Sequence, residues 1–297
     1  MAVKAEEYLQ PEVLARVARF DLKAKFLIEG FFSGLHRSPF KGFSAEFSDH
    51  RKYTSGDDIK DLDWRVYART NKYYIKRFQA ETNMDCHLVV DASASMGYGT
   101  RGLTKLEYAT YIAAALAFLV VRQQDSVGLI TFDDAIRAVL PPRSKRKHIF
   151  RILKVLNDTH PGRKANVSEM LHKVAGMIDK RGVVVVMSDL LDEPHDVIDA
   201  FAHLHHDGHD IIVFHILDQA EAQFPFADAR RFIDVETGEA VVTDAGSVRA
   251  GYLEALAQFI ELYRSELFKR NIDFFHVDTS TSFDKALMRY LLRRSGH

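Results

Sequence analysis

Short apolar runs alternate with helical segments from about residue 84 onward, and this alternation constrains the fold more than any other feature of the sequence. The apolar runs have the length of strands, and they predict strands at 85–91, 126–132, 183–188, 210–217 and 272–277. Apolar steps of three and four predict helices at 105–123, 145–157, 167–180, 194–207, 248–270 and 283–294. Strands that alternate with helices favour an α/β fold with a mostly parallel, doubly wound sheet that is flanked by helices.

Three local patterns refine this sheet. The continuous β-branched run Val183–Val186 is typical of a central strand that is buried on both faces. A short strand at 135–140 is expected to pair antiparallel with 126–132. Residues 230–243 predict a small β-hairpin with its turn at Thr237 and Gly238, inserted beside the main sheet.

The N-terminal segment, residues 1–83, has a different pattern from the rest of the chain. From Ser38 to Asp63 it has few periodic apolar residues and many charged and turn residues, so this stretch is expected to be irregular. The segment is short for an independent core, and we expect it to be a decoration packed on a main domain at 84–297. Its predicted elements are helices at 11–19 and 22–34 and a strand at Tyr73–Phe78.

Composition excludes several classes of protein. Hydrophobic residues make up 47% of the chain and the net charge is -1, which favours an ordinary globular core and gives no case for a nucleic-acid partner. The single cysteine excludes an intrachain disulfide. The longest apolar stretch, Tyr111 to Val121, is shorter than the roughly 20 residues that span a bilayer. The first ten residues also lack the apolar stretch of a signal peptide. We therefore expect a cytoplasmic, soluble protein without a transmembrane segment.

Candidate ligand residues follow two of the predicted strands. Asp91 ends the strand at 85–91, with Ser93 and Ser95 at alternate positions after it, and Asp189 ends the strand that starts at Val183. Ligands of open α/β sheets bind beyond the carboxyl ends of strands, so these side chains converge if the two strands are neighbours. Their hard oxygen atoms suit Mg²⁺, with Mn²⁺ or Ca²⁺ as alternatives. The other interpretation is that both aspartates accept backbone hydrogen bonds within their own loops.

This constellation resembles the metal-ion-dependent adhesion site of von Willebrand factor A-type domains. The resemblance implies that Ser93 and Ser95 bind the metal directly, and that Asp91 and Asp189 act directly or through water. The two serine hydroxyls are neutral, so a cation held there keeps charge with which to attract an acidic residue. In the family, the carboxylate of a partner protein completes the octahedron.

The chain departs from that family in a second loop, where the family places a threonine. Ala165 stands at the matching position. The neighbouring Asn166 could supply a carbonyl oxygen to the metal instead. Asn166 is also well placed to cap the next helix, with Glu169 three residues on completing a cap-like pair. A missing hydroxyl replaced by water would lower the affinity for the metal.

A longer pattern surrounds the strand-end loop and resembles the family called domain of unknown function 58. The resemblance covers about residues 35 to 294. Its members are commonly encoded beside AAA+ ATPases of the MoxR type, which implies such an ATPase as the partner. The matching segments are Gly42–Phe47, Arg51–Trp64, Ala68–Arg69, Lys76–Glu81, Phe232–Glu239, Arg249–Tyr252 and the C-terminal helix that ends at Leu291–Arg294.

An aspartate-rich segment around the single tryptophan has two interpretations. Asp57, Asp58, Asp63 and nearby basic residues could form an ion-pair network around a buried Trp64 indole. The same segment, with Arg69, could instead be a partner-binding surface, because Trp and Arg are enriched at binding hot spots.

Together these patterns predict a non-enzymatic protein-interaction module that holds Mg²⁺ and acts with a MoxR-type AAA+ ATPase in protein assembly or activation. One alternative is a metal-independent scaffold that uses the region Asp57–Trp64. The other is a metal-assisted hydrolase, for which His160 and His195 lie at loop positions but no nucleophile–base pair is evident. The sequence has no phosphate-binding loop, so any ATPase must be another chain.

Overall fold

The computed structural model describes residues 45–54, 62–80, 84–100, 102–283, 285–287 and 289–290. The described residues belong to two compact units, one within Gly34–Asn83 and one that contains everything from Met84 onward. The helices predicted at 11–19 and 22–34 lie outside the described residues.

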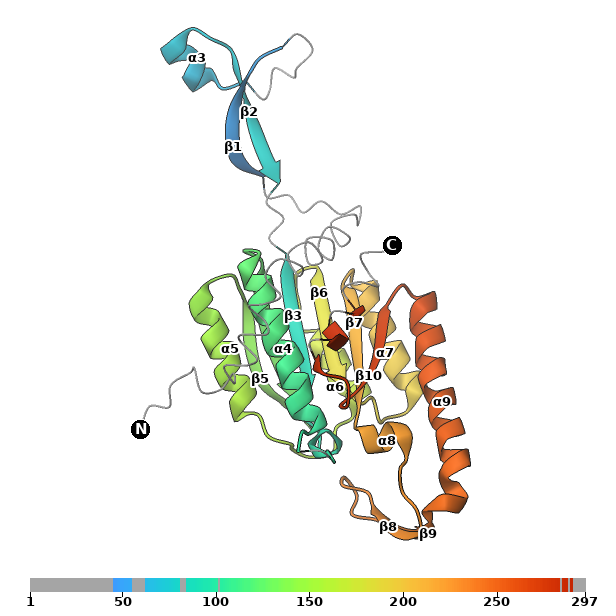
Figure 1. The fold of residues 1–297 in the computed structure, drawn as a ribbon. Coiled ribbons are helices and arrows are strands. Elements are labelled where there is room, and N and C mark those ends of the chain that lie inside the picture. The colour runs from blue at the N-terminus through green and yellow to red at the C-terminus, as the bar shows by residue number, and fades with distance from the viewer. Residues whose placement is uncertain are drawn as a thin grey trace, which may run out of the picture. The chain divides into compact units, whose positions relative to one another are not determined.

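The larger unit is built on a six-stranded sheet (Figure 1). Its strands are β3 (Asp85–Asp91), β4 (Ser126–Phe132), β5 (Ile136–Arg143), β6 (Gly182–Ser188), β7 (Asp210–Leu217) and β10 (Asp273–Asp278). The spatial order is β10-β7-β6-β3-β4-β5, and all neighbours are parallel except β4 and β5. The predicted mostly parallel α/β sheet is therefore confirmed, as is its one antiparallel pair.

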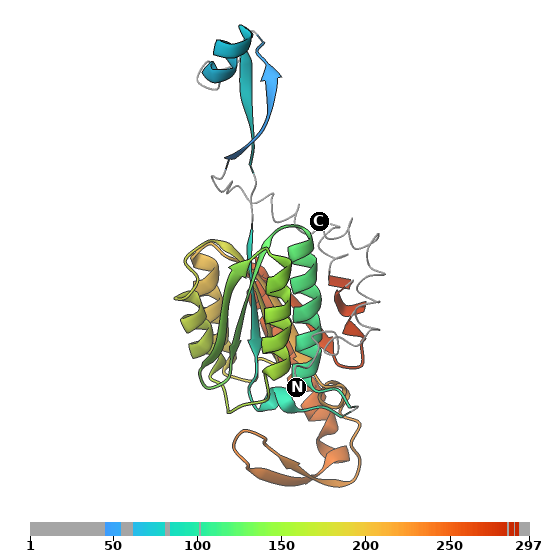
Figure 2. The ribbon, with the colours of Figure 1, turned by 90° about the vertical axis from the view of Figure 1, so that its left-hand side faces the viewer.

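Helices cover both faces of this sheet. Figure 2 shows α4 and α5 on one face and α6 and α7 on the other. A capping box of Thr104 and Glu107 starts α4, and α6 ends at Ala175 rather than at the predicted residue 180, with Gly176 as its C-cap. In the described part of the chain, no helix combines the length and the apolar character that crossing a bilayer requires. The helix bounds are α4 (Lys105–Arg122), α5 (Arg146–Asp158), α6 (Val167–Ala175), α7 (Pro194–His206), α8 (Gln219–Gln223) and α9 (Ala245–Lys269).

The core follows from strand alternation. Val89, Val184 and Val186 point to the face covered by α6, α7 and α9, where they join one large cluster of buried side chains. Leu88 and Val90 alternate with Val89 along β3 and are equally buried, so the sheet is apolar on both faces. This explains why the central strands are continuous apolar runs rather than alternating patterns.

β5 forms one edge of the sheet and contains Pro141 and Pro142. Proline cannot donate a backbone hydrogen bond, so an edge strand is one of the few positions where a sheet tolerates it. Beside it, a Cβ on Gly128 of β4 would lie 2.7 Å from the carbonyl oxygen of Leu140. The register of the β4–β5 pair shifts at this point, between Val127 and Leu129.

The predicted hairpin is confirmed. β8 (Ala229–Ile233) pairs antiparallel with β9 (Ala240–Asp244) as a separate two-stranded sheet that leads directly into α9. Asp234 organises the connecting turn: its carboxylate accepts hydrogen bonds from the Glu236 amide at 2.8 Å and from the Thr237 hydroxyl at 2.8 Å.

The smaller unit contains a strand that sequence analysis did not predict. β1 (Ala45–Lys52) pairs antiparallel with β2 (Tyr74–Ala80), and the short helix α3 (Trp64–Thr70) lies between them in sequence. The expectation of an irregular chain from Ser38 to Asp63 was therefore wrong for β1. Most residues of β1 are charged or polar, so it lacks the apolar alternation that identifies a half-buried strand.

Two histidines meet where β7 pairs with β10. His215 is fully buried, and its Nδ1 lies 3.0 Å from Nδ1 of His276, which is directly opposite in the parallel register. Burial lowers the pKa of His215 well below its usual value, and the nearby His276 adds to this effect. His215 is therefore neutral in the folded protein over the ordinary pH range.

Replacing His215 with phenylalanine should weaken the dependence of stability on acid. Below about pH 6.5 the unfolded chain binds a proton at this residue and the folded chain does not, so acidification favours unfolding. Between pH 7.5 and 5.5 the wild type should lose about 1.4 kcal/mol more unfolding free energy than His215→Phe. Urea unfolding at both pH values measures this difference, and equal losses in the two proteins would contradict the assignment.

Candidate functional site

The candidate site lies where two neighbouring strands end in carboxylates. β3 and β6 are paired, with Val90 opposite Met187, so Asp91 comes one residue after this pair and Asp189 two residues after it, at the same carboxyl end of the two strands. The chain runs from β3 outward to β4 and β5, then returns to β6 on the other side of β3. Such a reversal of strand order is where open α/β sheets bind ligands. The structure thus meets the condition under which sequence analysis predicted a shared site.

The Asp91 loop is tightly organised by its own hydrogen bonds. One carboxylate oxygen of Asp91 accepts from the Ser93 amide at 2.8 Å, and the other accepts from the Ser188 hydroxyl at 2.5 Å. The hydroxyl oxygens of Ser93 and Ser95 lie 3.0 Å apart. All four side chains are buried. The sequence analysis left two interpretations open, a cation site and hydrogen bonds within the loop. The geometry agrees in part with both, because Asp91 accepts a hydrogen bond from a loop amide and also lies beside the two hydroxyls.

Among the described residues, Asp91 has no positively charged partner. Burial raises the pKa of its carboxyl to about 7, and the negative charge of Asp189 contributes to the same shift. Hydrogen bonds from Ser188 and Ser93 oppose the shift only in part. In the part of the chain that the structure describes, no Lys, Arg or His forms an ion pair with Asp91. A cation at this position would remove an unfavourable buried charge.

Asp189 has a different environment, which sequence analysis missed. The ammonium of Lys105, in the first turn of α4, lies 2.8 Å from Asp189 Oδ2 and 2.7 Å from Glu221 Oε1 of α8. Lys105 is fully buried. Burial opposes its charge, but the two carboxylates outweigh burial and raise the pKa of Lys105 above its usual value. One oxygen of the second predicted metal ligand is thus already paired with a cation of the chain itself, which it shares with Glu221.

The second loop contacts the first through its backbone. The amide of Gly162 donates to the carbonyl of Ala92 at 2.7 Å, and the amide of Ala94 donates to the carbonyl of Arg163 at 3.2 Å. A Cβ at Gly162 would lie 1.9 Å from Oδ2 of Asp133, so this close approach requires glycine. Asp133, a buried residue that sequence analysis did not single out, accepts from the Arg163 amide at 3.4 Å.

Of the two roles predicted for Asn166, the structure describes the helix cap. Its side-chain oxygen accepts a hydrogen bond from the Glu169 amide at 2.8 Å, which makes Asn166 the N-cap of α6. The adjacent Ala165 is buried in the hydrophobic core. This loop therefore offers its backbone to the site, and neither side chain supplies a hydroxyl or a free amide oxygen.

The geometry of the hydroxyl pair suits a small divalent cation. Magnesium takes octahedral oxygen ligands at about 2.0–2.1 Å, so two neighbouring ligands of one ion lie about 3.0 Å apart. The Ser93 and Ser95 oxygens have this separation, at which the two hydroxyls also form a hydrogen bond with each other. The described residues contain no group of three His, Cys, Asp or Glu side chains that could hold a metal, so a site here must rely on hydroxyls and water as well as carboxylate.

The predicted partner-binding residues fall in the smaller unit or outside the described part of the chain. Asp57 and Asp58 lie outside the described residues. Asp63 is buried and accepts from the Val66 amide at 3.1 Å at the start of α3. The expected burial of the Trp64 indole was wrong, because 58% of Trp64 is exposed, and Arg69 is exposed as well.

Fold and site together define an α/β domain with a carboxylate and two hydroxyls at the switch point of its sheet. The profile of the family described as protein of unknown function DUF58 matches residues 49–259, well over half of the chain. The chain therefore belongs to the DUF58 family, as its sequence pattern indicated.

Similar proteins include the uncharacterized proteins Mb1516 of Mycobacterium bovis and Rv1480 of Mycobacterium tuberculosis. Each is 26% identical to this chain over 245 residues, which is 80% of this chain and 72% of the relative. Their names assign no activity.

Solved structures with similar folds include BatB from Bacteroides thetaiotaomicron, at 16% identity and TM-score 0.46, which covers 72% of this chain and 100% of that one. An aerotolerance-related membrane protein from Bacteroides fragilis gives 20% identity and TM-score 0.48, with 71% and 99% coverage. The VWA domain of SpRpn10 gives 15% identity and TM-score 0.39, with 70% and 95% coverage. Identities at this level bear on the fold alone.

Removing the buried ammonium should destabilise the fold strongly. Lys105→Met keeps the aliphatic length of the side chain but leaves Asp189 and Glu221 without a cation, and breaking a buried pair in this way costs about 3–5 kcal/mol. Lys154→Met, on the exposed surface of α5, is the matched control and should change stability by less than about 0.5 kcal/mol. Urea unfolding compares the three proteins. A Lys105→Met protein as stable as the control would show that the two carboxylates do not need the ammonium.

Proposed function

We propose that this protein is a non-enzymatic interaction module that binds Mg²⁺ at Asp91, Ser93 and Ser95 and uses the ion to hold an acidic residue of a partner protein. The observation that carries the proposal is the buried Asp91 carboxylate, which pairs with no cation among the described residues and lies beside a hydroxyl pair of octahedral spacing. Asp189 has a smaller part than the resemblance implied, because Lys105 holds one of its oxygens.

One carboxylate and two neutral hydroxyls leave a bound divalent cation with a net positive charge. Such an ion still needs ligands, and water or the carboxylate of a partner protein can supply them. The family resemblance suggests an AAA+ ATPase of the MoxR type as that partner, in protein assembly or activation. The chain's membership of the DUF58 family supports this partner through that resemblance.

Magnesium should stabilise the wild-type protein but not Asp91→Asn. At a Mg²⁺ concentration a hundredfold above Kd, binding to the folded state alone adds about 2.7 kcal/mol. Without metal at pH 8, Asp91→Asn should be at least as stable as the wild type, because the substitution removes a buried charge and keeps the shape. Thermal unfolding with Mg²⁺ or EDTA measures both effects.

The exposed Asp179→Asn serves as the control and should respond to Mg²⁺ as the wild type does. An equal response of the wild type and Asp91→Asn, or no response in either, would refute the metal site.

Capture of a purified MoxR-type ATPase tests the interaction itself. Immobilised wild-type protein should retain the ATPase in Mg²⁺, and Asp91→Asn should retain it at least about tenfold less well, because losing a metal–carboxylate contact weakens binding by more than about 1.4 kcal/mol. The variant is compared in Mg²⁺, so the ATPase keeps its own metal. Equal retention by both proteins would exclude the metal contact, and absence of retention by the wild type would exclude this partner.

The exposed Trp64 favours the metal-independent scaffold as a second candidate. Trp64 packs edge-on against Tyr67, whose ring stacks on Tyr73 with centroids 4.6 Å apart. These ring contacts hold the indole in place, and its exposed part can contact a partner. In the capture experiment, retention that survives Asp91→Asn but is lost in Trp64→Ala would favour this candidate.

A further inference from the structure

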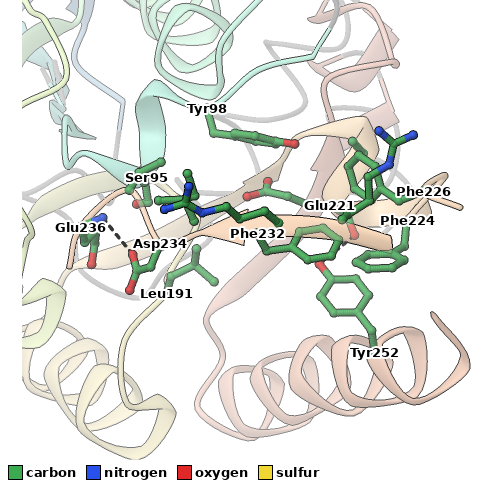
Figure 3. A pocket seen from close by; sticks show the side chains of 15 residues that line it. Ser95, Tyr98, Leu191, Glu221, Phe224, Phe226, Phe232, Asp234, Glu236 and Tyr252 are labelled. Carbon is green, nitrogen blue, oxygen red and sulfur yellow. Dashed lines mark hydrogen bonds between the residues drawn. The ribbon is translucent and has the colours of Figure 1, made fainter. Parts of the chain in front are cut away.

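A cavity of about 650 Å³ lies directly beside the candidate metal loop. Ser95 forms part of its wall, together with residues of the β8 hairpin strand and its turn, of α8 and of α9. Its volume is in the range of sites that bind small molecules or peptide side chains. Figure 3 shows Ser95 and Glu236 at one end of the cavity and Phe224, Phe226 and Tyr252 at the other.

The end away from Ser95 is aromatic and fixed in place. Phe224 stacks near Phe232 with ring centroids 5.5 Å apart, contacts Tyr252 at 4.6 Å and meets Phe226 edge-on at 5.2 Å. The Tyr252 hydroxyl donates to the carbonyl of Glu221 at 2.9 Å, which ties α9 to α8. Rings held in this way form a preformed apolar surface that loses little conformational entropy when a ligand binds.

Leu191 and Ile233 extend the apolar surface on two further walls. Leu191 follows β6 and is 47% exposed, whereas Ile233 ends β8 and is 54% exposed. Large apolar side chains exposed on different elements around one cavity are characteristic of a binding surface.

The charges around the cavity favour an acidic ligand. Glu221 is paired with Lys105, and Glu236 lies 3.6 Å from the ammonium of Lys164. Arg230 and Arg231 also line the cavity, and among the described residues neither forms an ion pair. Asp234 lines the cavity too, but its two carboxylate oxygens accept hydrogen bonds within the hairpin turn, so the two arginines are the charged side chains left for a partner.

We propose that this cavity binds a bulky apolar or aromatic side chain of an acidic peptide segment whose carboxylate meets the cation at Ser95. The inference rests on the proposed function and adds the chemistry of the partner to it. Because Ser95 lines the same cavity, one peptide segment can make both the apolar contact and the carboxylate contact. Because the aromatic end lies away from Ser95, the two contacts come from different residues of that segment.

An array of immobilised nonapeptides tests this inference. Each peptide carries one Asp and one Phe, separated by one to four residues in a Gly/Ser background, and matched peptides replace Asp with Asn or Phe with Ser. The intact wild-type protein, in Mg²⁺, should bind the Asp–Phe peptides about tenfold better than the Asp–Ser peptides at the favoured spacing.

Variants of two cavity walls separate the cavity from the metal loop. Leu191→Ser and Ile233→Ser should each reduce the preference for Phe to about twofold or less while binding still depends on Asp. Val242→Ser is the matched control, because Val242 lies on the same hairpin and is 72% exposed but does not line the cavity. It should bind as the wild type does.

The outcomes distinguish the two proposals. Binding that requires Asp and Mg²⁺ but shows no preference for Phe would overturn the cavity inference and leave the proposed function standing. A preference for Phe that is equal in Ile233→Ser, Leu191→Ser and Val242→Ser would also overturn it. Binding that requires Phe but neither Asp nor Mg²⁺ would overturn the metal-dependent function and the acidic part of the inference. No binding to any peptide would overturn both.

Discussion

The parallel pairing of β3 with β6 is the contact on which the candidate site depends. It brings the ends of two apolar strands together at the switch point of the sheet, and each strand is followed by a buried aspartate. Two like charges in a low-dielectric environment must each be compensated or protonated. Lys105 places one ammonium against Asp189 and Glu221, whereas the contacts that the structure describes for the Asp91 carboxylate are hydrogen bonds. This asymmetry, rather than the number of oxygen atoms, is the reason why the proposed cation site is centred on Asp91.

The Lys105 ion pairs also connect the candidate metal loop to the neighbouring cavity. Lys105 begins α4, Asp189 follows β6 and Glu221 belongs to α8, so one ammonium joins three separate elements. Asp218 reinforces the same region, because it accepts hydrogen bonds from the hydroxyls of Thr100 and Thr279 at 2.6 and 3.0 Å. Because these contacts hold the elements together, the proposed cation and the apolar surface keep a fixed distance and orientation. Such preorganisation favours binding.

The sequence predicted the elements whose signal is local and missed the contacts that depend on tertiary placement. The strand at 85–91 was predicted with its observed bounds, because a continuous apolar run ended by Asp91 is a local pattern. The Asn166 cap was also recognisable from the following Glu169. In contrast, Lys105 in the first turn of a helix is indistinguishable from a solvated lysine until β6 and α8 are placed around it. The polar β1 carried no apolar alternation, so its pairing with β2 had no local signal.

The prolines of β5 affect how copies of this protein can meet. An exposed edge strand is normally a template on which another chain can extend the sheet. Pro141 and Pro142 have no amide hydrogen, and because adjacent strand residues point to opposite sides, one of the two positions faces the open edge of β5. A further strand would therefore lack one hydrogen bond at this point, which makes the edge a poorer template for strand addition between copies of the protein.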